Sequence, residues 1–215
     1  MTAMPVRPIG LRERKKQRTR IQIIETALDL CDRHGFEATT IEEIAAAAQV
    51  APRTVTRYFT TKEDIVLGPM HDYLAATVEL LRERPRGGND LLALRDAYAT
   101  LLQRTADGDE VVDFDRVRQM QRIIHSSPSV RARCTEFGEI EADILAPVLA
   151  DRMDTTPDDI AVRLLVATWR MVSQAAMDEW ARHSPDQSAE SCRQAVLETF
   201  EIFRSMINRP SRSAQ

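Results

Sequence analysis

The sequence predicts an all-α protein of about nine helices, divided into a small N-terminal domain of three helices and a larger helical domain behind it. Ala, Leu, Arg and Glu are abundant and only 5% of the residues are aromatic, a composition that favours helix over strand. Apolar residues recur at spacings of three and four, and capping residues, prolines and glycines separate segments of helical length. With 215 residues, the chain is long enough for one or two domains with a core.

The first helix is predicted over residues 11–34, with Ile24 and Leu28 on its inward side. Gly35 fits a left-handed C-cap, which glycine adopts without the steric cost of a Cβ atom. We expect residues 1–10, which precede this helix, to form a disordered arm.

Residues 40–62, TIEEIAAAAQVAPRTVTRYFTTK, carry the most informative pattern in the chain. Thr40 and Glu43 have the spacing of a capping box at the start of a short helix. Gln49-Val50-Ala51 is a tight turn, and Pro52 suits the first position of the next helix, where no amide donor is needed. Two short helices joined by a tight turn make a helix-turn-helix, whose second helix can enter the major groove of DNA.

The second of these helices has one face suited to DNA. Val55 and Phe59 are four residues apart and should face inward, which leaves hydroxyl and basic side chains on the other side. These outward residues are Arg53, Thr54, Thr56, Arg57 and Tyr58. Residues 1–20 add seven Lys and Arg against one Glu, a net charge of +6. That charge, including Arg14, Lys15, Lys16 and Arg18, can neutralise phosphates or reach into a minor groove.

This ordered series of segments resembles the DNA-binding domain of the TetR family of bacterial repressors, from about Arg12 to Tyr73. The matching segments are TALDLCDRHGFEATTIEEIAAAAQV, the helix that ends in RYF, and TKEDIV. The resemblance implies that Thr40, Tyr58 and Lys62 hold DNA phosphates. Arg53, Thr54 and Arg57 are then the better candidates for base edges. One departure is Ala51, where relatives often have a Ser or Thr whose cap is worth about 1 kcal/mol.

Helix breakers divide the rest of the chain. The helix that Thr61 caps should kink or break at Pro69, because proline removes one helical hydrogen bond. Gly68-Pro69 is then either a hinge or a static kink. We expect a helix-turn-helix domain over residues 11–68, a helical ligand-binding and dimerisation domain over residues 69–208, and a disordered tail over residues 209–215. After a stop at residues 85–88, further helices are predicted over about 90–106, 111–125, 127–153, 156–183 and 188–208.

The helix predicted over residues 156–183 is apolar nearly all round, so it should be buried on several sides. One face could line a cavity and another could meet a second subunit. The family resemblance implies a homodimer in which the last two helices pack against their copies, whereas an ordinary monomeric core is the alternative. The candidate interface residues are Trp180, Val196, Phe200 and Phe203.

Two segments of the C-terminal half, RVRQMQRIIHSSPSVRARCTEFGEIEADI and PDDIAVRLLVATWRM, carry a second resemblance. They are similar to the acyl-CoA-like ligand-binding domain of a TetR subgroup that includes regulators linked to mycofactocin systems. Arg116, Arg118 and Arg122 could meet the phosphates of a CoA-like ligand, or could be solvated charges or ion pairs. The candidates for an apolar ligand pocket are Phe114, Met120, Phe137, Trp169 and Met171.

Charge and missing motifs limit the function further. Residues 1–68 carry a net charge of +2 and residues 69–215 a net charge of −6, which suits a DNA reader joined to a domain that stays off DNA. There is no GxSxG, P-loop or HExxH motif, so we expect no enzyme activity, no cofactor and no metal site. Three cysteines without a CxxC pair, and no apolar run of membrane-spanning length, predict a cytoplasmic protein that does not bind membranes.

These observations predict a dimeric transcriptional regulator, most simply a repressor, that binds palindromic double-stranded DNA. A small apolar or acyl-CoA-like ligand would release it, provided that the ligand binds the released conformation more tightly. One alternative is a structural or nucleoid-associated DNA-binding dimer with no ligand, which a well-packed C-terminal core would favour. A helical enzyme of acyl-CoA metabolism is a remote alternative.

Overall fold

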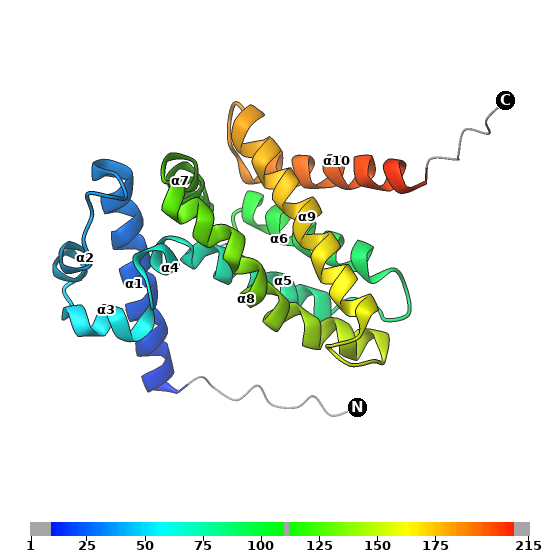
Figure 1. The fold of residues 1–215 in the computed structure, drawn as a ribbon, viewed down its shortest axis with the longest axis horizontal. Helices are drawn as coiled ribbons and strands as arrows, with labels where there is room; N and C mark the ends of the chain where they lie inside the picture. The colour runs from blue at the N-terminus through cyan, green and yellow to red at the C-terminus, as the bar shows by residue number, and fades with distance from the viewer. Residues whose placement is uncertain (1–9, 110–111, 209–215) are drawn as a thin grey trace.

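Ten α-helices and no strand make up residues 10–109 and 112–208, which are the residues that the computed structural model describes (Figure 1). The predicted arm, except Gly10, and the predicted tail lie outside these residues. The all-α prediction is confirmed. The tenth helix arises because the segment expected to kink at Pro69 is two separate helices. The helices are α1 (Leu11–His34), α2 (Ile41–Ala47), α3 (Pro52–Tyr58), α4 (Lys62–Val66), α5 (Gly68–Arg82), α6 (Asp90–Ala106), α7 (Phe114–Ser126), α8 (Pro128–Met153), α9 (Ile160–His183) and α10 (Ala189–Ile207).

Helices α1 to α4 lie together at one end of the molecule in Figure 1, one helix more than the three predicted for the N-terminal domain, because the segment from Lys62 ends at Val66 as a separate helix. Both predicted capping boxes are present: the Thr40 hydroxyl accepts from the Glu43 amide at 3.2 Å, and the Thr61 hydroxyl accepts from the Asp64 amide at the same distance. Ala51 provides no side-chain cap for α3, as its methyl group requires. Gly35 differs from the prediction, because its φ of 85° is joined to a ψ of 150° rather than a left-handed helical value.

The break between α4 and α5 is a close contact with α1. Gly68 is buried, and a Cβ atom added to it would lie 2.5 Å from Cδ1 of Ile24. Only glycine therefore fits without a shift of the Ile24 side chain, and Pro69 follows it as an early residue of α5. Gly68 is thus needed for packing, whether or not the junction also moves.

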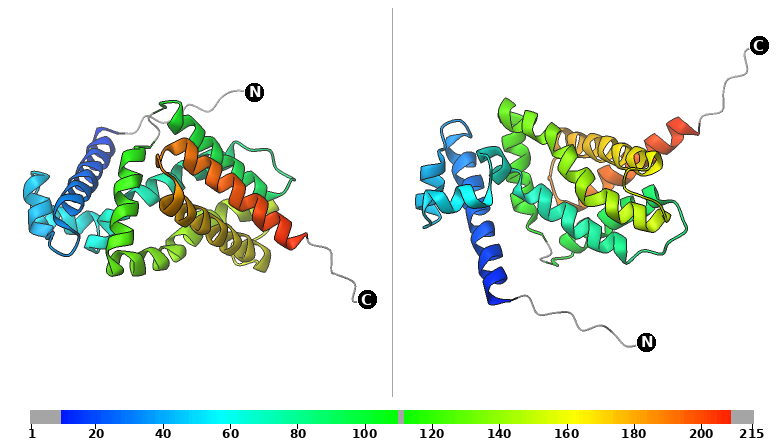
Figure 2. Two further views of the ribbon diagram at one scale, coloured as in Figure 1. Left: turned by 90° about the horizontal axis from the view of Figure 1, so that it is seen from above. Right: turned by 60° about the horizontal axis from the view of Figure 1, so that its bottom comes forward.

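Helices α5 to α10 form the second domain, in which α10 packs against both α9 and α6 (Figure 2). Two helices begin later than the sequence predicts. Helix α7 begins at Phe114 behind an Asp113 cap, and Val111 lies outside the described residues. Helix α9 begins at Ile160, because Asp159 rather than Thr156 caps it: its carboxylate accepts from the Ala161 amide at 2.8 Å.

A buried arginine on α8, Arg152, binds the loop between α5 and α6. The Arg152 side chain, on α8, is 3% exposed, and its Nε lies 2.7 Å from Oδ1 of Asp90. Its other nitrogens donate to the backbone carbonyls of Leu81, Arg84 and Pro85 at 2.8–3.0 Å. Because a buried charge is tolerated only when its donors are used, this set of bonds fixes the loop against α8.

Candidate functional site

The helix-turn-helix places α3 on the surface of the N-terminal domain. Ala45 accepts a hydrogen bond from the Val50 amide at 2.9 Å, and Gln49 has a φ of 55°, so the turn between the two helices is tight. Val55 and Phe59 are buried beneath α3, as predicted. The helix therefore has one side fixed in the core and one side open to a partner.

The predicted base-reading residues lie on that open side. Arg53, Thr56 and Arg57 are exposed, while Thr54 and Tyr58 are half-buried. The Arg57 guanidinium lies 5.4 Å from the centre of the Tyr58 ring, which limits the positions that both side chains take. The predicted arm residues Arg14, Lys15, Lys16 and Arg18 are also exposed, and they lie in the first turns of α1, in agreement with the helix predicted over residues 11–34.

Two of the candidate phosphate contacts, Thr40 and Lys62, also make contacts within the N-terminal domain. Thr40 is exposed at the start of α2, where its hydroxyl takes part in the capping box. The Lys62 ammonium donates to the carbonyls of Phe36 and Thr39 at 2.6 and 2.7 Å and lies 4.0 Å from the centre of the Phe36 ring. An ammonium group has three donors, so one remains for a phosphate. The sequence alone did not reveal this bridge between α4 and the loop before α2.

A cavity of about 490 Å³ lies in the second domain, which is within the range of small-molecule sites. Four of the five predicted pocket residues line it: Met120, Phe137, Trp169 and Met171. Phe114 does not; its ring packs against the rings of Tyr73 and Trp180, with centres 6.4 and 5.4 Å away. The first residue of α7 is therefore part of the core beside the cavity.

Glu141, on α8, is a lining residue that the sequence analysis missed. Glu141 is 9% exposed, and the wall around it combines aromatic and methionine residues with polar side chains. Burial raises the pKa of Glu141 to about 7, although the Arg170 charge and the Trp169 indole partly oppose this shift. Helix α8 has no distinct apolar face in the sequence, so the pattern around this glutamate gives no signal of burial, and only the fold could place it in the cavity.

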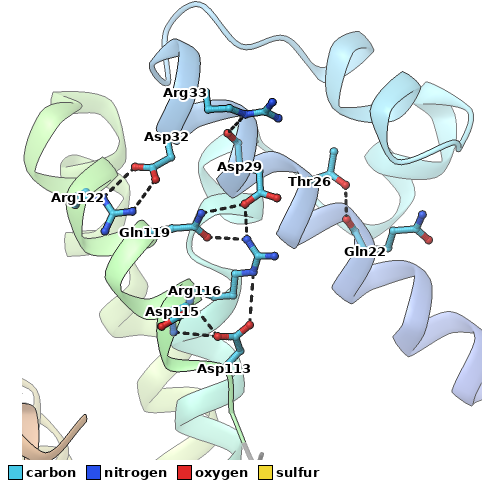
Figure 3. A network of polar contacts seen from close by, with 10 residues as sticks. All are labelled: Gln22, Thr26, Asp29, Asp32, Arg33, Asp113, Asp115, Arg116, Gln119 and Arg122. Carbon is cyan, nitrogen blue, oxygen red and sulfur yellow. Dashed lines mark hydrogen bonds and ion pairs between the residues drawn. The ribbon is translucent and has the colours of Figure 1, made fainter. Parts of the chain in front are cut away.

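Helix α7 lines the cavity and also contacts α1 of the N-terminal domain, through the polar contacts drawn in Figure 3. Its Val117, Met120 and Ile124 line the cavity. From the same helix, the Arg116 guanidinium lies 2.5 Å from Asp29 of α1 and the Arg122 guanidinium lies 2.6 Å from Asp32. We call these two ion pairs, with the hydrogen bond from Gln119 to Asp29 at 2.9 Å, the α1–α7 bridge.

The α1–α7 bridge explains the charges that the sequence analysis considered for CoA phosphates. Arg116 and Arg122 are paired with α1, and Arg118 is paired with Asp115 on its own helix. Burial opposes ionisation of Asp29, but hydrogen bonds from Gln119 and Arg116 hold the pKa of Asp29 below its ordinary value. The bonds from Arg122 lower the pKa of Asp32 in the same way. Of the two interpretations, ion pairs describe these arginines.

The candidate dimer residues lie mostly inside the protomer. Trp180, Val196 and Phe200 are at most 2% exposed, and Phe203 is half-buried against Phe200. Their apolar spacing reflects packing of α9 and α10 within one chain. Large apolar side chains on these two helices are exposed elsewhere: Ile160, Leu164, Met171, Ile202, Met206 and Ile207.

Other kinds of site find no support among the described residues. No cluster of His, Cys, Asp or Glu there could hold a metal ion, and no helix there is long and apolar enough to span a bilayer. The thiols of Cys31, Cys134 and Cys192 are all free. Burial raises the pKa of Cys134 to about 11 and that of Cys192 to about 12, so both are protonated thiols at neutral pH.

Comparison with known proteins agrees with this architecture. A family model for bacterial regulatory proteins of the tetR family matches residues 23–68, and a model for the MftR C-terminal domain matches residues 91–202. The HTH-type transcriptional regulator TcmR of Streptomyces glaucescens is 37% identical over 173 residues, which cover 80% of this chain and 76% of TcmR. MftR of Mycobacterium tuberculosis, described as a mycofactocin biosynthesis transcriptional regulator, is 27% identical to this chain. The matched residues cover 91% of this chain and 94% of MftR.

A solved structure of a TetR-family regulator from Syntrophomonas wolfei has the same fold, with a TM-score of 0.57 at 16% identity over 92% of this chain and 99% of that one. The helix-turn-helix domain and the helical domain with its cavity define a DNA-binding regulator of transcription. This chain belongs to the TetR family of bacterial transcriptional regulators. TetR regulators bind DNA and small-molecule ligands and act as dimers.

Proposed function

We propose that this regulator is a repressor that binds a palindromic operator as a homodimer and leaves it when a small molecule enters the cavity of the second domain. The α1–α7 bridge is the observation that carries the proposal. One helix contributes Val117, Met120 and Ile124 to the cavity and binds α1 of the DNA-binding domain through Arg116 and Arg122. A ligand that shifts α7 would therefore change the position of α1.

The cavity also helps to choose between a ligand-responsive regulator and the alternative of a structural DNA-binding dimer with no ligand. A structural DNA-binding dimer needs no internal space, whereas a ligand-responsive regulator does, so a cavity of about 490 Å³ supports the second. An acyl-CoA-like effector is the class that the family resemblance implies. Its phosphates would need cations other than those of the α1–α7 bridge, and Arg131 and Arg170 are the arginines that line the cavity.

For the dimer, the exposed apolar residues of α9 and α10 replace the candidates that are buried in the protomer. Leu164 on α9 is 59% exposed, and Ile202 and Met206 on α10 are 60% and 67% exposed. These two helices pack against each other, and we propose that their exposed apolar residues meet a second copy. Covering such side chains on both copies would remove apolar surface from water at about 25 cal/mol per Å².

For DNA, we assign phosphate contacts to Thr40, Tyr58 and Lys62, and base contacts to Arg53, Thr54 and Arg57, with Thr56 beside them. The basic residues at the start of α1 would neutralise further phosphates. Arg57→Ala tests the assignment. The change should weaken binding to the operator by about 10- to 100-fold, the value of a good base contact of roughly 1–3 kcal/mol.

The probe for this test is DNA that the native protein selects from a random pool, and the measurement is fluorescence anisotropy. Arg104→Ala is the matched control, because Arg104 is exposed on α6 in the other domain and the substitution changes the net charge equally. Lys62→Ala should weaken all sequences alike and reduce the salt slope by about one. Its unfolding must be measured beside it, since Lys62 also holds two carbonyls. Equal affinity of the Arg57→Ala and Arg104→Ala proteins would remove Arg57 from the interface.

A further inference from the structure

The carboxyl group of Glu141 is a feature of the cavity that an apolar effector does not explain, and the buried Tyr73 hydroxyl, which has no hydrogen-bond partner among the described residues, is a second. Glu141 is 9% exposed and belongs to the cavity wall. The Trp169 indole is the single polar group that the described residues bring to it as a hydrogen-bond donor, and Arg170 acts on it as a nearby charge. An indole has one N–H, so at least one carboxyl oxygen has no protein donor.

Part of the cavity wall consists of aromatic rings and thioether groups. Tyr98 and Trp169 pack edge to face, with ring centres 5.5 Å apart, and Phe137 lies nearby in the same wall. Met120 and Met177 add thioether groups. Such walls suit aromatic ligands, because rings prefer offset or edge contacts with rings and favourable contacts with sulfur.

The other charged side chains of the wall are less buried than Glu141: Asp178 is half-buried, and Arg131 and Arg170 are exposed. Arg170 is exposed, and its side chain passes over Gly138 so closely that a Cβ atom there would overlap it. Arg131 is also exposed, and its guanidinium donates to the carbonyls of Ile124 and His125 at 3.4 and 2.7 Å. Glu141 is therefore the buried charge-bearing group that an enclosed ligand would meet.

The identity of the ligand group follows from this arrangement. A hydrocarbon placed against Glu141 leaves the carboxyl group unpaired and excludes water from it, which weakens the binding of the hydrocarbon. A hydroxyl or amine of the ligand would instead donate a charge-assisted hydrogen bond. A site built to bond a hydroxyl group rejects the analogue that lacks it more strongly than an apolar pocket distinguishes sizes.

We propose that Glu141 determines the specificity of the cavity and selects compact aromatic effectors that carry a hydroxyl or amine donor over hydrocarbons and acyl chains. This inference rests on the proposed function, since it takes the cavity as the effector site.

Equilibrium dialysis of the full chain against 2-naphthol, naphthalene and dodecanoyl-CoA tests the inference. The native protein should bind 2-naphthol at least tenfold more tightly than naphthalene. Glu141→Met removes the acceptor at similar volume and should reduce this ratio below about threefold, mainly by weakening 2-naphthol. Glu141→Gln keeps an acceptor oxygen and should retain part of the ratio, which separates a lost hydrogen bond from a repacked wall. Glu139→Met, on the exposed side of α8, should leave the ratio unchanged.

Three results would overturn the inference. They are equal binding of 2-naphthol and naphthalene, a ratio that survives in Glu141→Met, or tighter binding of dodecanoyl-CoA that Glu141→Met does not alter. In each of these cases a ligand still binds, so the cavity remains the effector site of the proposed function. Failure of all three probes to bind would instead contradict both.

Discussion

Glu141→Gln should make the protein more stable at alkaline pH, and the structure determines the sign. The pKa of Glu141 is about 7 in the folded chain, against an ordinary value of 4.5. Between these values the folded chain holds a proton that the unfolded chain has released. The stabilisation linked to that proton is fully present below pH 4.5 and is lost as the pH rises through 7. The amide that replaces the carboxyl group does not titrate, so the variant should lack this loss.

The size of the effect follows from the shift. One pKa unit corresponds to about 1.36 kcal/mol, so a shift from 4.5 to about 7 represents roughly 3 kcal/mol in all. The part that falls between pH 5.5 and pH 8 is about 2 kcal/mol. Arg170 and Trp169 act on Glu141 against the effect of burial. Burial raises the pKa of Tyr98 and of Cys134, and the Glu141 charge adds to both shifts.

The assay is urea unfolding of the native protein and the variant at pH 5.5 and 8, at one protein concentration. Burial lowers the pKa of His71, which gives stability the opposite dependence on pH. This contribution is common to both proteins and cancels in their difference. The difference should grow by about 2 kcal/mol in favour of Glu141→Gln as the pH rises. A constant difference between the two pH values would refute the burial of an ionisable carboxyl group in the cavity.

Three further predictions concern packing and assembly. Arg152→Met should lower the free energy of unfolding by about 3–5 kcal/mol, because it leaves Asp90 and three carbonyls without their donor. The control Arg82→Met removes an exposed ion pair and should lower it by under about 1 kcal/mol. Both values are measured by urea unfolding. Gly68→Ala should lower the free energy of unfolding by about 1–3 kcal/mol, because the added Cβ atom overlaps Ile24. In a chain that already carries Ile24→Ala, Gly68→Ala should not have this cost. If the effects of the two substitutions simply add, the contact is contradicted. Leu164→Glu should yield a folded monomer in sedimentation with most operator affinity lost, and a dimer that persists would place the interface elsewhere.

The packing of Gly68 decides which substitution can test whether Gly68-Pro69 is a hinge. Replacing both residues by alanine would combine any stiffening with the overlap at Ile24. Pro69→Ala alone avoids that overlap. If the junction is a hinge, the variant should bind ligand normally but lose less operator affinity when ligand is added. An equal ligand-induced loss in both proteins would leave a static break.

The sequence by itself determined the features that depend on a few neighbouring residues. The capping boxes at Thr40 and Thr61 join residues three apart, so their pattern is complete in the sequence, and both are present. The bounds of α1 and α6 follow from the same local rules and agree with the prediction. The inward positions of Val55 and Phe59 also follow, because helical spacing places them on one face.

Only the tertiary structure decided which surfaces meet. Apolar spacing marked Phe200 as buried, but it could not say whether the cover is the same chain or a second copy. Arg116 and its partner Asp29 are 87 residues apart, and Glu141 enters the cavity only because α9 lies across α8. Periodicity reports the direction in which a side chain leaves its own helix. The partner that it meets depends on how whole helices pack, and that packing is set by contacts between segments far apart in the chain.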